Sequence, residues 1–158
     1  MNILVDDLPE VIEVDGVEHA INFDFRTGLQ CILDMESHDL VDDEKALLLL
    51  RRIYGDKIPT NVSEALRLAV KFLDGGEEPE AHENLLKNNT RVYSFEKDAA
   101  LIYAAFRQTH GIDLQKADLH WWQFLALFHD LGADTAFCSM VNLRRRVSNG
   151  DAAKEERE

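Results

Sequence analysis

The sequence predicts a mainly α-helical protein, a bundle of about five to six helices with a small N-terminal β-hairpin. Apolar residues recur at helical spacing through most of the chain, and the helical segments are bounded by capping residues and glycines. One Asp-Gly pair near the N-terminus separates two β-branched runs. The 158 residues are enough for one domain, which we expect over residues 1–150, before a charged tail at 151–158.

The hairpin is expected over about residues 8–22. Val11–Val14 and Val17–Ile21 flank Asp15-Gly16, and this dipeptide suits a two-residue turn in which both residues have positive φ. An isolated hairpin is marginally stable in water, so this one is expected to pack against helices.

Three helices are expected between the hairpin and residue 76. The first begins at Asp24, and the second begins at Asp42, an N-cap candidate, and ends before Gly55. Asn61 is the expected N-cap of the third, which Asp74-Gly75-Gly76 ends.

A mobile acidic loop is expected over about residues 75–92, because this stretch has few apolar residues to hold it. Three further helices should follow it, each starting at a residue whose side chain can accept from the first-turn amides. The expected N-caps are Ser94, Asp118 and Asp134; Gly111 and Gly132 end the first two helices, and the last runs through Arg146.

The formal net charge of −13 argues against non-specific binding to nucleic acid or to an anionic membrane surface. It suits a basic patch on a protein partner. Cys31 and Cys138 are far apart and outside any CxxC spacing, so we expect buried free thiols and no zinc site or cofactor. The N-terminus has no signal-peptide pattern, and no apolar run approaches membrane-spanning length, so we expect a cytoplasmic protein.

His129-Asp130 is the strongest enzyme candidate, since metal-dependent phosphohydrolases of the His-Asp type use such a pair as ligands. The remaining ligands would come from His110 or His120 and from Asp134 or Asp151. Adjacent His and Asp residues also occur by chance, and a polar pair at the end of a helix is ordinary. We therefore expect a protein that is not an enzyme, with a metal phosphohydrolase as the alternative.

Arg144, Arg145 and Arg146 form the one dense basic run. Cations at a helix C-terminus are stabilised by the helix dipole, which explains the run without a partner. The alternative is contact with an acidic protein partner.

The aromatic residues near Trp121 and Trp122 are the candidates for partner binding. These two side chains point about 100° apart on a helix that is apolar nearly all round, so the helix is central in its domain or faces a partner. The candidate partner-binding residues are Tyr103, Phe106, Trp121, Trp122, Phe124 and Phe128.

The segment from Tyr93 to Phe137, with its Trp-Trp pair, resembles the bacteriophage gene-product-fifteen family. A weaker likeness covers Ile12–Gly16, Ile21-Asn22 and Asp24–Thr27. The resemblance implies a phage or prophage protein of the tail gene region in the host cytoplasm, a tail assembly chaperone that binds the tape-measure protein. The sequence leaves open whether the protein also forms a homo-oligomer. A structural tail or connector component is the alternative in the same setting. The resemblance supplies no catalytic residues.

Overall fold

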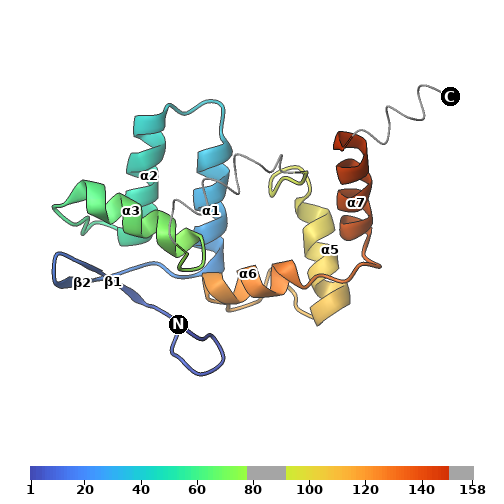
Figure 1. The fold of residues 1–158 in the computed structure, drawn as a ribbon, viewed down its shortest axis with the longest axis horizontal. Helices are drawn as coiled ribbons and strands as arrows, with labels where there is room; N and C mark the ends of the chain where they lie inside the picture. The colour runs from blue at the N-terminus through green and yellow to red at the C-terminus, as the bar shows by residue number, and fades with distance from the viewer. Residues whose placement is uncertain (78–91, 150–158) are drawn as a thin grey trace. The chain divides into compact units, whose positions relative to one another are not determined.

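The computed structural model describes residues 1–77 and 92–149, and in these ranges the protein is mainly α-helical with one N-terminal hairpin, as predicted (Figure 1). Most of the expected loop at about 75–92 and the whole tail at 151–158 lie outside the described residues. The elements are β1 (Val11–Val14), β2 (Val17–Ala20), α1 (Phe25–Glu36), α2 (Asp42–Tyr54), α3 (Val62–Leu73), α5 (Ala99–His110), α6 (Trp121–His129) and α7 (Ala136–Ser148).

The chain forms two compact units, each made of two stretches of sequence. The first unit comprises Met1–Asn88 and Asp118–Leu125, and the second comprises Asn89–Ala117 and Ala126–Glu158. Helix α6 therefore starts in the first unit and ends in the second.

The hairpin has the predicted turn. Val14 pairs with Val17, so the loop between the antiparallel strands is the two residues Asp15 and Gly16. Their φ angles are 52° and 81°, the left-handed region that this turn requires. Strand β1 packs against α3, which supplies the helical support that a two-stranded sheet needs.

The first unit confirms the predicted cap of α3, shows a cap at the predicted start of α1 and corrects the predicted cap of α2. The side chain of Asp24 accepts a hydrogen bond from the Arg26 amide, and Asn61 accepts from the Glu64 amide. The prediction that Asp42 is the N-cap of α2 is wrong by one residue, since Val41 holds that position. Asp42 instead lies in the acidic first turn, where its charge complements the helix dipole.

In the second unit, Gly111 ends α5 in the left-handed conformation, as predicted. The Ser94 hydroxyl caps a turn before α5 by accepting from the amides of Glu96 and Lys97, so the helix itself begins only at Ala99. The predicted N-cap Asp134 is also wrong. Thr135 caps α7 by accepting from the Cys138 amide, while the Asp134 carboxylate accepts from Gln108.

Each unit has its own apolar interior. In the first unit it includes Phe25, Cys31, Leu49, Ile53, Ala65, Ala69, Phe72, Trp121 and Phe124; in the second it includes Ile102, Ala105, Phe106, Phe128, Phe137 and Val141. Cys31 is a buried free thiol whose pKa burial raises to about 12, whereas Cys138 is half-buried. Within residues 1–77 and 92–149, no helix is long and apolar enough to cross a membrane.

Candidate functional site

The aromatic helix α6 starts at a hydrogen-bonded junction around His120 and not at the predicted cap Asp118. The Trp122 amide donates to His120 Nδ1 at 3.0 Å, so the ring proton lies on Nε2, which donates to the Pro9 carbonyl at 2.8 Å. An isolated bridge pairs Asp24 with His120, so the segment before α6 runs beside the start of α1. These partners are distant in sequence, and together they fix where the helix begins.

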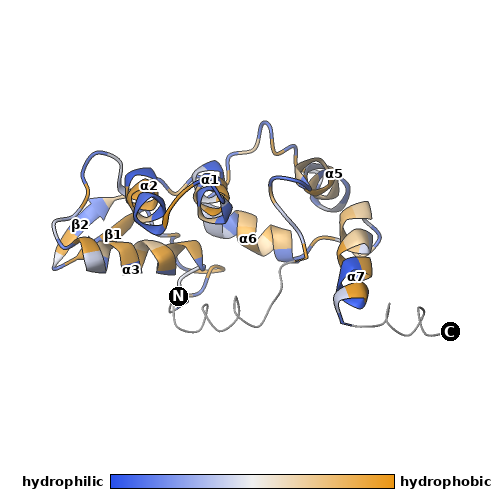
Figure 2. Ribbon diagram, turned by 90° about the horizontal axis from the view of Figure 1, so that it is seen from above, coloured by the Kyte–Doolittle hydropathy of each residue, from blue (hydrophilic) through white to orange (hydrophobic). Residues whose placement is uncertain are grey.

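The two tryptophans of α6 close the C-terminal end of α3. Trp121 Nε1 donates to the Leu73 carbonyl at 3.0 Å, and Trp122 Nε1 donates to the Phe72 carbonyl at 2.7 Å. The last carbonyls of a helix have no partner within the helix, so the Trp121 indole satisfies a carbonyl that would otherwise need water, while the Trp122 indole adds a second donor to the Phe72 carbonyl. Figure 2 shows α6 coloured mostly as hydrophobic, and these two N–H groups are its polar attachment to α3.

Two glycines allow the tryptophans to lie close to the backbone. A Cβ atom at Gly28, the fourth residue of α1, would overlap the six-membered ring of Trp121. A Cβ atom at Gly76, where φ is +96°, would lie 3.0 Å from the Trp122 ring. Sequence reasoning missed Gly28; the one available signal was a glycine in a helix interior, where it is disfavoured unless packing requires it.

In the second unit, Phe128 is the centre of an aromatic cluster. Its ring centroid lies 5.3 Å from that of Tyr93, 5.2 Å from that of Phe95 and 5.8 Å from that of Phe137. Aromatic pairs at such distances in tilted arrangements are favourable beyond their buried area. The cluster joins the end of α6 to the start of α7 and to the chain before α5.

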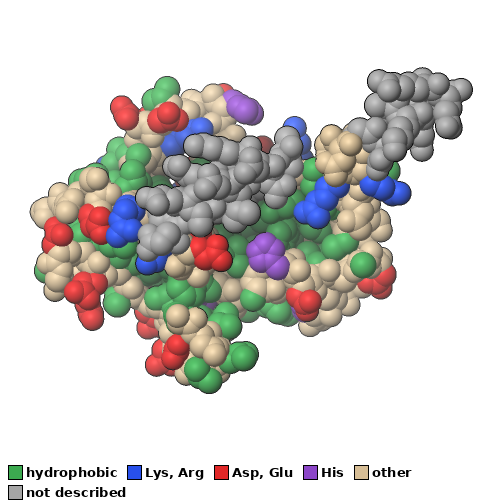
Figure 3. Space-filling model, viewed as in Figure 1, with side chains coloured by type: hydrophobic (Ala, Val, Ile, Leu, Met, Phe, Trp, Pro, Cys, Tyr) green, Lys and Arg blue, Asp and Glu red, His purple; other side chains and the backbone are tan. Residues whose placement is uncertain are grey.

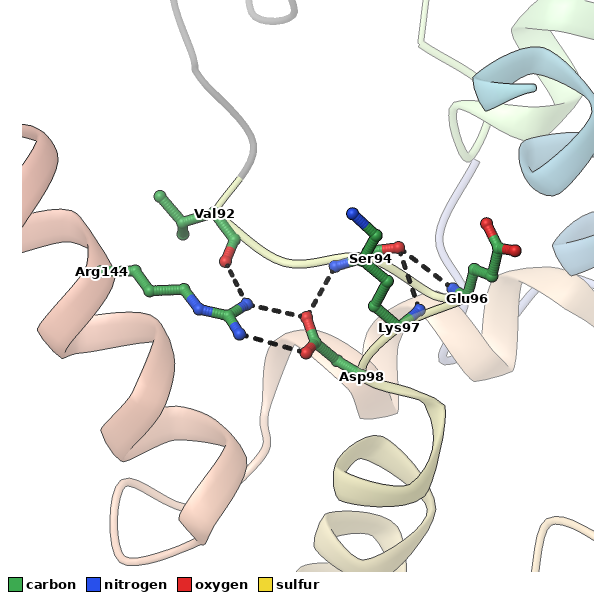
Figure 4. Close-up of polar contacts among 6 residues, drawn as sticks. All are labelled: Val92, Ser94, Glu96, Lys97, Asp98 and Arg144. Atoms are coloured by element: carbon green, nitrogen blue, oxygen red, sulfur yellow. Dashed lines mark hydrogen bonds and ion pairs between the residues drawn. The ribbon is translucent and has the colours of Figure 1, made fainter. Parts of the chain in front are cut away.

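An ion pair connects α7 to the turn before α5 (Figure 4). Arg144 Nη1 lies 2.9 Å from Asp98 Oδ2 and 3.0 Å from the Val92 carbonyl. The side chain of Asp98 is 6% exposed, and Asp98 Oδ2 also accepts from the Ser94 amide. The Arg144 guanidinium therefore holds the pKa of Asp98 below its usual value, and this arginine acts within its own unit.

Four of the six predicted partner-binding residues are buried within their units: Phe106, Trp121, Phe124 and Phe128. Tyr103 and Trp122 are half-buried. The Tyr103 hydroxyl donates to Asp113 Oδ1 at 2.7 Å, and this hydrogen bond raises the pKa of the tyrosine. Tyr103 and Trp122 are therefore the members of this set with surface left for a partner in the described conformation.

The His-Asp candidates do not form a metal site among residues 1–77 and 92–149, where no three His, Cys, Asp or Glu residues are grouped closely enough to hold an ion. His129 and Asp130 are exposed at the end of α6. His110 Nε2 lies 2.8 Å from the Leu127 carbonyl, and Asp151 lies outside the described residues. Among the described residues, the structure therefore does not bring His129 and Asp130 together with a third candidate ligand.

The hairpin presents acidic side chains that face each other. Glu13 and Glu18 are directly opposite in the register, and both are exposed. Like charges in this position destabilise a hairpin. Figure 3 shows acidic side chains at many places on one face of the molecule, in keeping with the net charge of −13.

Comparison with known proteins gives one match. The family model described as "Bacteriophage Gp15 protein" matches residues 4–158, essentially the whole chain. No curated protein and no solved structure matches.

Proposed function

Because the chain belongs to the Bacteriophage Gp15 protein family, and is therefore a phage protein, we propose that it acts without catalysis by binding another phage protein during tail assembly. The partner that we propose is the tape-measure protein, which this chain would keep soluble in the host cytoplasm before the tail tube forms. The family match over residues 4–158 is the observation that carries this proposal. The surface of the first unit adds two features that suit a binding protein.

The first feature is the opposed pair Glu13 and Glu18 on the exposed face of the hairpin. Their repulsion disfavours the hairpin in the isolated protein. A Lys or Arg side chain of a partner between the two carboxylates would turn this repulsion into attraction. Charge complementarity of this kind raises the rate of association and makes binding weaken with salt.

The second feature is an apolar turn just before the hairpin. Ile3, Leu4 and Val5 are 47%, 87% and 78% exposed, respectively. Backbone hydrogen bonds from the amides of Val5 and Asp6 to the Asn2 carbonyl, at 3.1 and 2.8 Å, hold the turn closed. Three adjacent exposed apolar residues in an ordered turn offer an apolar surface that a partner would remove from water. Together the two features fit a partner segment that carries both apolar and basic side chains.

Co-expression with the tape-measure protein of the same phage genome tests the proposal. We expect the tape-measure protein to move from the insoluble to the soluble fraction and to co-purify with this chain at low salt. Raising the salt concentration to about 0.5 M should weaken the complex, because screening shortens the reach of the charges. A tape-measure protein that is equally insoluble with and without this chain, with no complex at low salt, contradicts the chaperone role.

A charge-neutralised hairpin gives a sharper version of this test. The double variant Glu13→Gln, Glu18→Gln should unfold at slightly higher temperature, since it loses a repulsion of about 0.2–1 kcal/mol. It should nevertheless bind the tape-measure protein roughly fivefold more weakly and with a smaller dependence on salt. The matched control, Glu96→Gln with Asp118→Asn, removes two exposed carboxylates elsewhere and should leave binding unchanged.

A structural tail or connector component is the second candidate, since membership of the same phage family fits it equally. The two roles differ in whether the protein remains in the finished particle. Mass spectrometry of purified virions should detect the tail tube protein and not this chain if the role is assembly alone. Stoichiometric amounts of this chain in the virion would favour the structural role.

A further inference from the structure

Helix α7 carries two stripes of side chains, and the second unit uses one of them. The inner stripe is Phe137, Val141 and Arg144: the first two are buried, and the third holds Asp98. The outer stripe is rotated by one residue, about 100°, around the same helix. It consists of Ala136, Met140, Leu143 and Val147.

The outer stripe is apolar but uncovered at its C-terminal end. Leu143 is 54% exposed and Val147 is 55% exposed, whereas Met140 is half-buried. The successive spacings of four, three and four residues in this stripe match the seam of a two-helix coiled coil. A helix that carries such a seam has the geometry to pack along another helix with a similar seam.

The charge of α7 is opposite to that of the chain as a whole. The chain has 30 acidic residues, yet none lies between Ala136 and Ser148. Arg145 and Arg146 are exposed at the end of the helix, and in coiled-coil terms Arg146 flanks the seam. The helix dipole alone explains cations at this end, but it does not explain an apolar stripe beside them.

We propose that the outer stripe of α7 is a docking surface for an amphipathic helix of a partner protein that carries Asp or Glu beside its apolar seam. The spacing of the stripe fits a helical partner, and Arg146, which flanks the stripe, fits an acidic residue beside the partner's seam. A protein helix fits better than nucleic acid, because Leu143 and Val147 contribute apolar surface where a phosphate backbone would need cations. This surface lies in the second unit and is independent of the tape-measure hypothesis and of the hairpin.

Designed peptides test this proposal with the full-length chain. A fluorescent helical peptide of about three heptads, with Leu seams and Glu flanks, should bind with a measurable increase in anisotropy. The same peptide with Lys flanks should bind about tenfold more weakly at low salt, and the difference should shrink at high salt. A peptide with a scrambled seam should not bind.

Two variants assign the binding to α7. Arg146→Glu should reverse the preference, so that the Lys-flanked peptide binds more tightly than the Glu-flanked one, whereas Arg145→Glu, on the opposite side of α7, should change it much less. Leu143→Gln with Val147→Gln should abolish binding of both peptides. Leu47→Gln, a change at an exposed leucine of α2, is the control that should retain wild-type binding. Circular dichroism melts should confirm that every variant remains folded.

Three outcomes overturn the proposal. The first is binding that does not discriminate between Glu and Lys flanks. The second is a wild-type dimer, detected by light scattering, that Leu143→Gln with Val147→Gln converts to a monomer, since this would assign the stripe to a second copy. The third is loss of stability in Arg146→Glu without any change in peptide preference, which would leave this arginine with a helix-dipole role alone.

Discussion

At the scale of single residues, Gly28 is the described glycine at which an added Cβ atom would meet its nearest neighbour at the shortest distance, 2.3 Å. It lies inside α1, where glycine is less favourable than alanine by about 1 kcal/mol. The Trp121 ring occupies the space that a Cβ atom would need. The glycine is therefore required for close packing of α1 against the start of α6, both of which belong to the first unit.

We predict that Gly28→Ala destabilises the protein by roughly 2 kcal/mol or more, because overpacking outweighs the better helix propensity of alanine. Urea denaturation measures the change in the free energy of unfolding. In a Trp121→Leu background the same substitution should cost much less, since a smaller side chain leaves room for the methyl group. Stabilisation by Gly28→Ala in the wild-type background would show that Trp121 does not pack on α1.

Asp74 gives the first unit a predictable response to pH. It follows the last residue of α3, and burial raises its pKa from 3.8 to about 7, with a further contribution from the charge of Glu77. A carboxyl with a raised folded-state pKa costs nothing below pH 4, where it is protonated in both states. Its ionisation opposes folding increasingly between pH 4 and 7, and the full penalty applies above pH 7.

We predict that Asp74→Asn is more stable than the wild type at pH 8, by on the order of 1–2 kcal/mol once solvent screening of this half-buried group is allowed for. The gain should vanish near pH 4. Thermal melts at pH 4, 6 and 8 measure this trend, with Asp118→Asn as an exposed control. A gain that is equal at every pH would mean that the charge of Asp74 is not its cause.

At the scale of elements, the attachment of α6 to α3 depends on two indole N–H groups that are not equivalent. The Leu73 carbonyl accepts from Trp121, which is buried. The Phe72 carbonyl accepts from Trp122 and also from the Gly75 amide at 3.1 Å. Loss of the Trp121 indole therefore leaves the Leu73 carbonyl without its protein donor, whereas loss of the Trp122 indole leaves the Phe72 carbonyl with the Gly75 amide.

We predict that Trp121→Phe costs about 3 kcal/mol, from the lost hydrogen bond and the cavity, whereas Trp122→Phe costs about 1 kcal/mol. Chemical denaturation of the two variants provides the comparison. Hydrogen exchange of the last-turn amides of α3 should also accelerate more in Trp121→Phe. Equal costs for the two variants would contradict the idea that the Leu73 carbonyl depends more on its indole partner than the Phe72 carbonyl does.

The sequence predicted correctly those turns and helix ends that are determined by hydrogen bonds between neighbouring residues. The turn at Asp15-Gly16 and the caps Asp24 and Asn61 need only residues within three positions along the chain. The start of α6 was misplaced because distant partners set it: His120 is held by Pro9 and pairs with Asp24. Sequence patterns carry no direct record of such contacts.

The candidate site was predicted in outline only. The sequence indicated an aromatic helix that is central in its domain or faces a partner. In the structure, Trp121, Phe124 and Phe128 of this helix are buried within their units. The sequence could not show that each tryptophan packs against a glycine, because Gly28 and Gly76 lie more than 40 residues before Trp121 and Trp122 along the chain. The exposed stripe of α7 was also missed, because apolar spacing does not distinguish the inner stripe from the outer one.

At the scale of the whole molecule, neither unit is formed by one continuous stretch of the chain. The first unit takes residues from Met1 to Asn88 and is completed by Asp118–Leu125, after a stretch that belongs to the second unit. The completing segment supplies His120, Trp121 and Phe124 to the first unit. We therefore expect that the N-terminal half of the sequence does not fold by itself.

We predict that a fragment comprising residues 1–117 lacks a cooperative thermal transition, although it contains α1, α2, α3 and the hairpin. Without residues 118–125 the space beside Gly28 is empty and the Leu73 carbonyl loses its partner. Differential scanning calorimetry measures the transition. Adding back residues 118–129 through a flexible linker should restore it, and a fragment 1–117 that melts like the intact protein would contradict the assignment of the segment.

The position of Trp121 also has a consequence on the ribosome. By the time Leu73 has been made, α1, α2 and α3 are all present in the nascent chain, but the start of α6, which packs on Gly28 of α1 and bonds the end of α3, is not. At about 5–20 residues per second, translation of the roughly 50 intervening residues takes roughly 2 to 10 s. During those seconds the surface around Gly28 is open to trigger-factor-like holdases and to proteases. Codon choice between residues 77 and 120 should therefore affect the soluble yield of this protein more than codon choice after residue 130.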